Sequence, residues 1–148
     1  MLSPPVSLRQ RALRVVDANS NRAREGLRVC EDLIRFCLGS EQQFRRLRAL
    51  RRALNVQLGR LPLKPAEVVR FRDSQRDPGR MSRSPSVKSV EHLLLINLQR
   101  TKEALRVLEE SCRLVAPRQA LGFQRLRFRT YHVERSLLIG LAALRHRR

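Results

Sequence analysis

One short pattern occurs twice in this chain of 148 residues and limits its fold more than any other feature. The pattern Asn-x-x-Arg-x-x-Glu-x-Leu-Arg-Val-x-Glu begins at Asn19 and again at Asn97, which is 78 positions later. A second block repeats with a shift of 79 and aligns Phe44, Arg46, Leu47 and Arg48 with Phe123, Arg125, Leu126 and Arg127. Two copies are too few for a solenoid, so the repeats indicate the duplication of one unit.

Apolar residues recur in each copy with the period of an α-helix, about 3.6 residues. In the first copy they predict a helix over about 7–38 that stops at Gly39. A second helix is expected to start at a capping box formed by Ser40 and Gln43 and to end at Gly59. Each unit is thus predicted to be a hairpin of two antiparallel helices.

The second copy carries equivalent signals for helix starts. Ser86 or Ser89 is expected to cap its first helix, and Pro117 to begin its second. Between the copies, residues 60–87 contain most of the prolines and show little periodicity, which predicts a long loop. No segment of the sequence has the alternating pattern of a strand.

These signals together predict an all-α fold, a four-helix bundle of two duplicated antiparallel helix hairpins with a long central loop. A chain of this length suits one domain with one core. The single domain 1–148 is expected to comprise repeat one at about 7–59, the loop at 60–87 and repeat two at about 88–146.

The charge of the chain is strongly basic, with 32 Lys and Arg residues against 13 Asp and Glu residues and a formal net charge of +19. Such a charge favours anionic partners, which include nucleic acid, acidic lipids and phosphorylated metabolites. Trp is absent and Tyr occurs once, so the sequence lacks the aromatic residues on which bases stack. Nucleic-acid binding is therefore the lowest-ranked function.

The cysteines Cys30, Cys37 and Cys112 lack the spacing of a zinc site. They are expected to be free thiols in a reduced core. The longest apolar run, 137–144, is too short to cross a bilayer, and the first residues do not resemble a signal peptide. A cytoplasmic location without a membrane partner is the resulting expectation.

Polar residues of the first motif follow one another at intervals of three: Asn19, Arg22, Glu25, Arg28 and Glu31. Three residues turn a helix by about 300°, so the set drifts around the helix by about 60° per step. The first three therefore share a broad face near the apolar stripe, whereas the last two move to the outside. The second motif has the same arrangement in Asn97, Arg100 and Glu103, followed by Arg106 and Glu109.

Two interpretations of this arrangement stay open. A buried amide needs hydrogen-bond partners, so Asn19 and Asn97 act either as a structural lock or as groups that contact a ligand. The charged residues of the shared face form either i,i+3 ion pairs in solvent or an interior site. Outside ion pairs are expected for Arg28 with Glu31 and for their equivalents in the second copy.

The central loop concentrates charged residues within eleven positions: Arg70, Arg72, Asp73, Arg76, Asp77 and Arg80. Phosphoryl transfer needs cations to neutralise phosphate charge, and carboxylates to hold magnesium or orient a hydroxyl. Asp73 and Asp77 are candidates for the second role and Arg72 for the first. The alternative is a basic, mobile linker with incidental aspartates. The sequence contains no P-loop and no dinucleotide-binding glycine motif.

Segments 16–32 and 97–110, with their paired motifs, resemble a small family, the all-helical hydroxymethylpyrimidine phosphate kinase domain. That domain is found alone or fused ahead of thiamine phosphate synthase, and the resemblance covers roughly 10–145. It implies an ATP-dependent kinase of thiamine biosynthesis that converts hydroxymethylpyrimidine phosphate to its diphosphate with magnesium. The synthase barrel is absent from this sequence, so the chain is not expected to join pyrimidine to thiazole.

The resemblance also implies a set of site residues in this chain. Asp73 and Asp77 would be catalytic and would hold magnesium. Substrate and phosphate would contact Asn19, Arg22, Glu25, Arg72, Asn97, Arg100 and Glu103. The main alternative is a non-catalytic helical partner of thiamine phosphate synthase, kept for assembly or substrate retention. A homodimer with composite sites is an arrangement that the sequence leaves open.

Overall fold

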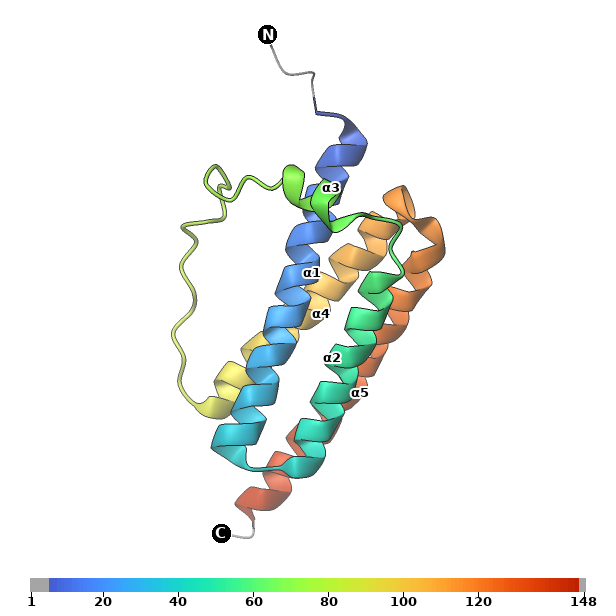
Figure 1. Cartoon of the computed structure of the whole chain (residues 1–148). Coiled ribbons are helices and arrows are strands. Elements are labelled where there is room, and N and C mark those ends of the chain that lie inside the picture. Colours follow the sequence, from blue (N-terminus) through green and yellow to red (C-terminus); the bar gives the residue numbers. More distant parts are fainter. Residues whose placement is uncertain (1–5, 147–148) are drawn as a thin grey trace.

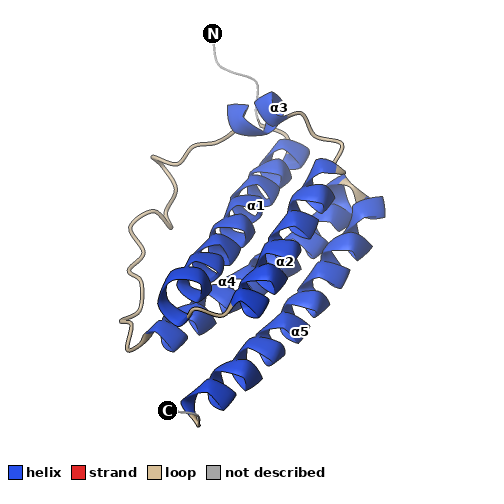
Figure 2. Cartoon of the chain, turned by 60° about the horizontal axis from the view of Figure 1, so that its bottom comes forward, coloured by secondary structure: helices blue, strands red, loops and turns tan. Residues whose placement is uncertain are grey.

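The computed structural model describes residues 6–146, and every regular element in that range is helical (Figures 1 and 2). Four long helices form the bundle, and short helical segments connect them. In chain order the elements are α1 (Leu8–Asp32), a π-helical turn (Leu33–Leu38), α2 (Glu41–Gly59), α3 (Pro65–Arg70), α4 (Val90–Val115), a 3₁₀ turn (Pro117–Gln119) and α5 (Ala120–Arg145). The predicted all-α bundle is confirmed.

The first helix begins and ends at the residues that the sequence indicates. Ser7 caps α1 in a capping box, since its Oγ accepts the Gln10 N–H at 3.2 Å and its own N–H donates to Gln10 Oε1 at 2.8 Å. The last turn is π-helical, and the Gly39 N–H closes it by donating to the Ile34 carbonyl at 2.8 Å. Gly39 has φ 66°, a left-handed conformation that favours glycine at a helix end.

The predicted capping box at the start of α2 is only half present. Ser40 Oγ accepts the Gln43 N–H at 3.4 Å, as expected. The Gln43 side chain, however, is buried between helices, and its Nε2 donates to the Ser136 carbonyl of α5 at 3.3 Å. Packing of α2 on α5 therefore takes the amide away from the cap.

In the second copy, Ser89 rather than Ser86 is the cap, and its Oγ accepts the His92 N–H at 3.0 Å. Pro117 begins the 3₁₀ turn that leads into α5. The prediction of a loop without structure over 60–87 is wrong in one place, because Pro65 starts the short helix α3. A proline at the first helical position has a suitable fixed φ and gives up no hydrogen bond there.

The two hairpins pack antiparallel to one another, α1 against α4 and α2 against α5 (Figures 1 and 2). Residues 71–89 run along the outside of the bundle from α3 to the start of α4. The two helices α1 and α4 approach each other closely at Gly26, where a Cβ atom would collide with Thr101 Oγ1 and lie 3.0 Å from the Asn97 carbonyl oxygen. Glycine at this position lets the two motif-bearing helices meet.

A single apolar core joins the four long helices. Its members are almost inaccessible to solvent, and burial of such side chains is the main stabilising contribution in a domain of this size. The largest fully buried side chains are Phe123, Leu13, Leu27, Ile34, Leu47, Leu50, Leu54, Leu94, Leu98, Leu105, Leu108 and Leu137. All of them except Leu13 lie at positions that the helical apolar spacing predicts. Leu144, which the same spacing places in the stripe of α5, is 44% exposed.

The predicted outside ion pair of Arg28 with Glu31 is wrong. Glu31 is buried and pairs with Arg51 of α2, whereas Arg28 lies 3.6 Å from Asp32. The equivalent Glu109 is also buried and accepts from Arg127 of α5 at 3.0 Å. Each hairpin therefore has a carboxylate that ties its two helices together.

Glu109 keeps its predicted neighbour as well, with 3.5 Å between its Oε1 and Arg106 Nη1. This second ion pair follows from local helical spacing. The cross-helix contact to Arg127 depends instead on how α4 and α5 pack, and the motif spacing does not contain that information.

Two of the three cysteines lie in the core as predicted, and the third does not. Cys30 and Cys112 are buried, whereas Cys37 in the π-helical turn is exposed. All three are free thiols. Among the helices in the described range, none combines the length and the apolar character that crossing a bilayer requires. The cytoplasmic location stays a prediction.

Candidate functional site

The two motif copies meet at the α1–α4 contact and line one hollow of about 580 Å³, here named the motif cleft. Five lining residues come from each helix, and every α1 residue has its partner 78 positions later on α4. The α1 residues are Asn19, Arg22, Glu25, Gly26 and Val29, and the α4 residues are Asn97, Arg100, Glu103, Ala104 and Val107. The cleft is thus built from equivalent positions of both repeats.

The two asparagines of the motif cleft are 4% and 6% exposed. Asn19 Nδ2 donates to the Val15 carbonyl at 2.9 Å, and Asn97 Nδ2 donates to the Leu93 carbonyl at the same distance. Both amides are therefore locked on their own helices by the same bond. Asn19 Oδ1 lies 3.5 Å from Arg22 Nη1 and directs the acceptor side of the amide toward the charged residues of the cleft.

Four charged side chains of the cleft are exposed: Arg22, Glu25, Arg100 and Glu103. Within residues 6–146 none of the four takes part in an ion pair. Glu103 accepts a hydrogen bond from Gln99 Nε2 at 3.1 Å. The interpretation of Arg22 and Glu25 as an i,i+3 surface ion pair is therefore wrong, and these charges face the cleft without a fixed protein counter-ion.

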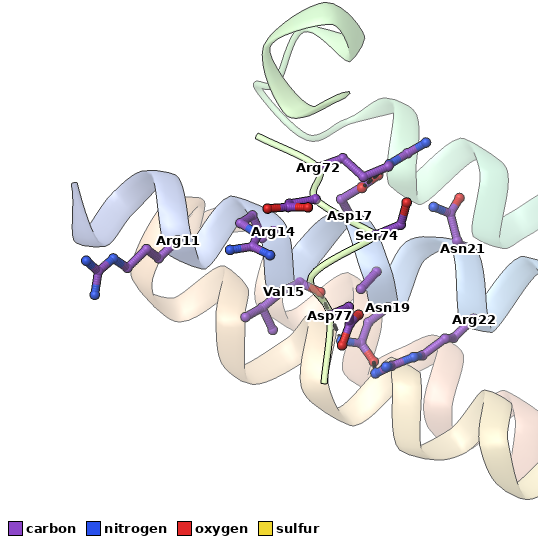
Figure 3. Close-up of a pocket in the computed structure, with 12 residues that line it drawn as sticks. Arg11, Arg14, Val15, Asp17, Asn19, Asn21, Arg22, Arg72, Ser74 and Asp77 are labelled. Atoms are coloured by element: carbon purple, nitrogen blue, oxygen red, sulfur yellow. Dashed lines mark hydrogen bonds and ion pairs between the residues drawn. The ribbon is translucent and has the colours of Figure 1, made fainter. Parts of the chain in front are cut away.

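A second hollow of about 480 Å³, the loop cleft, adjoins the first along α1 (Figure 3). Its walls are α1 and the start of the central loop, and it shares two residues with the motif cleft, Asn19 and Arg22. The remaining lining residues are Arg11, Arg14, Val15, Asp17, Ala18, Asn21, Arg72, Asp73, Ser74 and Asp77. All residues of the predicted site thus line one of these two adjoining hollows.

Arg72 holds the loop on α1 through Asp17 (Figure 3). Its Nε lies 2.8 Å from Asp17 Oδ2 and its Nη2 lies 2.7 Å from Asp17 Oδ1, which is a bidentate pair. The hydrogen bonds to Asp17 raise the pKa of Arg72 further. A phosphate at Arg72 would compete with this carboxylate, and the predicted phosphate contact stays a prediction.

Both loop aspartates cap turns within their own segment. Asp73 Oδ1 accepts the Arg76 N–H at 3.3 Å, and Asp77 Oδ1 accepts the Gly79 N–H at 2.8 Å. Such bonds are typical of aspartate in turns. They give each carboxylate a structural role beside the catalytic one that the family resemblance implies.

The described residues contain no group of three or more His, Cys, Asp or Glu residues placed to hold a metal ion. Magnesium usually binds one or two carboxylates together with phosphate oxygens and water. Asp73 and Asp77 line one hollow and fit such a site only together with a phosphorylated ligand. Magnesium and ATP both stay predictions.

Sequence reasoning missed Arg11, Arg14 and Asp17 in the loop cleft. Helical spacing could have identified the two arginines. Positions 11, 14 and 15 lie on the same helix face as Asn19 and Arg22 and extend that face toward the N-terminus. Asp17 gave no such signal, since its partner Arg72 is distant in the sequence. Only the fold brings these two residues together.

Comparison with known proteins places this architecture in a family. The model of the ThiD2 family matches residues 14–136. The chain is 38% identical over 128 residues to a thiamine-phosphate synthase of Gloeobacter violaceus, an alignment that covers 84% of this chain and 36% of the relative. It is 36% identical over 134 residues to the thiamine-phosphate synthase of a Nostoc species, covering 88% and 36%.

A more distant relative is the thiamine-phosphate synthase of Rhodopirellula baltica, 32% identical over 138 residues, with 91% of this chain and 36% of the relative covered. The chain therefore spans little more than a third of the length of these relatives. The comparison with solved structures finds no match.

These findings contradict the prediction of a hydroxymethylpyrimidine phosphate kinase. Each of these alignments includes most of this chain, and each relative is named thiamine-phosphate synthase. None of the three names refers to a kinase. They favour the alternative that the sequence left open, a helical partner domain of that synthase. The link to thiamine biosynthesis is retained, whereas the homodimer stays a prediction.

Proposed function

The chain belongs to the ThiD2 family, and from this premise we propose that it is a non-catalytic helical partner of thiamine-phosphate synthase that retains a phosphorylated pyrimidine. The relatives support the association, because a stretch equivalent to this chain makes up about a third of proteins with that name. As a partner domain, it would hold a phosphorylated pyrimidine close to the synthase.

The motif cleft is the observation that carries the ligand-binding part of this proposal. Arg22 and Arg100 stand at equivalent positions, and neither takes part in an ion pair with another residue of the part of the chain that the structure describes. Guanidinium groups match phosphate oxygens in geometry and charge. The buried amides of Asn19 and Asn97 offer hydrogen bonds to the polar edge of a pyrimidine beside that phosphate.

The net charge of +19 supports the same ligand class. A basic field raises the local concentration of anions and accelerates their encounter with the site. Four arginines surround the loop cleft and its junction with the motif cleft: Arg11, Arg14, Arg22 and Arg72. A phosphorylated metabolite would therefore approach along α1.

The outer face of α5 is the surface that best fits the synthase. Its large exposed apolar side chains are Leu121, Phe128, Tyr131, Leu138 and Ile139. Helical geometry places all five within an arc of about 100°, away from the buried stripe of α5. A largely apolar face of this kind is typical of an interaction site.

Exposed Arg125 and Arg129 flank this face, and exposed Arg135 lies within it. A second copy of the chain would set arginine against arginine, whereas an acidic surface on the synthase would complement them. We therefore assign the α5 face to the synthase rather than to a homodimer.

Calorimetric titration with hydroxymethylpyrimidine phosphate tests the ligand. Wild-type protein is expected to bind it, and Arg22→Gln with Arg100→Gln together should weaken binding at least about tenfold because two charged contacts are lost. Arg52→Gln on the exposed side of α2 is the matched control and should leave the affinity unchanged. An equal effect of the control, or no binding by folded wild-type protein, would refute the retention role.

A pull-down with purified thiamine-phosphate synthase tests the partnership. Association is expected, and Phe128→Ala should reduce it because Phe128 is 58% exposed at the centre of the α5 face. Phe36→Ala removes a ring that is 70% exposed from the π-helical turn and should have no effect. Asp73→Ala should also be neutral, since the role is not catalytic. Absence of association contradicts the proposal.

A further inference from the structure

A third hollow, of about 550 Å³, lies between α1, the end of α2 and α3, and is here named the hairpin hollow. Arg24 and Asn55 are among its polar lining residues, and Leu58, Leu61 and Val68 are among its apolar ones. A hollow of this size suits a small molecule. The ligand that we propose for the motif cleft does not account for it.

The equivalent place in the second hairpin is occupied by an internal ion pair. A shift of 78 places Arg24 over Lys102, and a shift of 79 places Asn55 over Glu134. Lys102 Nζ lies 3.0 and 2.8 Å from the two carboxylate oxygens of Glu134. The side chains are only 9% and 17% exposed, so the pair is largely buried between α4 and α5.

Side-chain size differs between the hairpins at the same place. Ser20 of the hollow corresponds to Leu98, which is fully buried. The second hairpin thus fills the part of the groove around Leu98 and Lys102 with its own side chains. A smaller hollow of about 310 Å³ remains between α4 and α5, and Leu95 and Leu138 are among its lining residues.

The first hairpin keeps the cation of this arrangement but lacks the anion. Among the described residues Arg24 takes part in no ion pair, and its Nη2 donates only to the exposed Asn21 Oδ1 at 3.3 Å. Asn55 supplies a neutral amide where Glu134 supplies a carboxylate. An arginine beside apolar walls without its carboxylate partner is a receptor for an external anion.

We propose that the hairpin hollow binds a small molecule with a carboxylate or phosphate group on an apolar body, and that its anion takes the place that the Glu134 carboxylate has in the second hairpin. The apolar body contacts Leu58, Leu61 and Val68. The pair of Asp17 and Arg72 lines both this hollow and the loop cleft, so the site adjoins the candidate substrate site through that pair. The inference does not depend on the partnership with the synthase.

Amide NMR spectra recorded during titrations with phenyl phosphate and with benzoate test this site. The resonances of Leu61, Val68 and Val69 are expected to shift, whereas those of Asn97 and Arg100 should not. Inorganic phosphate lacks the apolar body of the ligand, and benzyl alcohol lacks its anionic group. Each should bind at least about tenfold more weakly than the stronger of the two main probes. The stronger of the two main probes identifies the preferred anion.

Asn55→Glu is the sharpest variant, because it gives Arg24 the internal carboxylate of the second hairpin. It should weaken binding of the stronger probe at least about tenfold. Val56→Glu adds the same charge at the neighbouring exposed position and should weaken binding by less than about threefold, since screened surface charges act weakly. Arg24→Gln removes the cation and decides the matter if Asn55→Glu fails to fold, as judged by circular dichroism.

Three results would overturn the inference. The first is shifts confined to residues of the motif cleft, which would locate the probe there. The second is equal weakening by Asn55→Glu and Val56→Glu, which would indicate a general charge effect. The third is unchanged binding in folded Arg24→Gln. None of these results bears on the pull-down or on binding of hydroxymethylpyrimidine phosphate to the motif cleft.

Discussion

The first hairpin, α1 with α2, and the second, α4 with α5, carry the same motif on their inner helices and differ on the outer side of those helices. In both, the motif asparagine bonds the carbonyl four residues earlier and the motif glutamate ties the two helices together. Away from the motif cleft, the second hairpin pairs Lys102 with Glu134 between its helices, whereas the first leaves a hollow around Arg24 where that pair would be.

The difference shows which part of a duplicated sequence is constrained by packing. The inner faces of α1 and α4 pack against each other, so a change in one copy must fit the other. The outer grooves do not contact each other, and each was able to change independently. We therefore expect substitutions on the inner faces to have large and similar effects on the two hairpins. Substitutions in the outer grooves should have small effects, or effects that differ between the hairpins.

The largest contrast is expected in thiol reactivity. It tests whether the core excludes solvent equally well in the first hairpin, which holds Cys30, and in the second, which holds Cys112. Burial raises the pKa of Cys30 to about 12 and that of Cys112 to about 11, from an ordinary value of 9.0. At pH 8 a shift of this size leaves roughly a hundredfold to a thousandfold less thiolate. Exposed Cys37 should therefore react first with iodoacetamide, as measured by mass spectrometry. Rapid labelling of one core thiol would show that its hairpin is open.

The same shifts give the sign of a pH dependence. Between about pH 9 and 12 the unfolded chain releases thiol protons that the folded chain retains, so the stability contributed by these neutral thiols is lost as the pH rises. Cys30→Ala should flatten this part of the curve of unfolding free energy against pH. Cys37→Ala serves as the exposed control and should leave the slope unchanged.

Gly26→Leu is expected to cost about 3 kcal/mol of unfolding free energy, because its side chain has no room between α1 and α4. Urea denaturation measures this loss. Ala104→Gly at the equivalent position of α4 should cost only about 1 kcal/mol, the difference in helix propensity. Gly59→Ala, in open space at the end of α2, should not destabilise the protein. A mild effect of Gly26→Leu would mean that the two inner faces are not closely packed.

The next largest difference in unfolding free energy is expected at the ion pair of Lys102 with Glu134. Lys102→Ala should cost about 2 kcal/mol, because it leaves the Glu134 carboxylate half-buried without its partner. Arg24→Ala, the equivalent change in the first hairpin, should alter unfolding free energy by less than about 0.5 kcal/mol in urea. Equal losses from both changes would remove the proposed distinction between a filled groove and an open one.

The smallest effect on global stability is expected at Arg72. Arg72→Ala should leave the urea midpoint unchanged but accelerate hydrogen exchange of the amides in residues 73–77, since the loop loses its bond to Asp17. Arg76→Ala, an exposed arginine of the same loop, is the control. The second hairpin has Leu95 where the first has Asp17, so it has no such tether. Unchanged exchange would show that other contacts hold the loop.

The sequence predicted the long helices and most of their ends because these depend on local chemistry. Apolar spacing defines the buried stripe, Ser7 and Ser89 satisfy free N–H groups at helix starts, and Gly39 adopts a left-handed turn. The placement of Asn19 and Asn97 toward a partner helix also follows from helical geometry. Such information is contained within one or two turns of chain.

The side chains that bond to one another between different helices were not predictable in the same way. Glu31 pairs with Arg51 on another helix rather than with Arg28, and the Gln43 side chain donates to the Ser136 carbonyl rather than capping its own helix. The motif itself was fixed by the sequence as two identical sets of polar residues on two helices. Only the antiparallel packing of α1 on α4, permitted by Gly26, brought the two sets into one cleft, because helix crossing is decided by how all four buried stripes fit together.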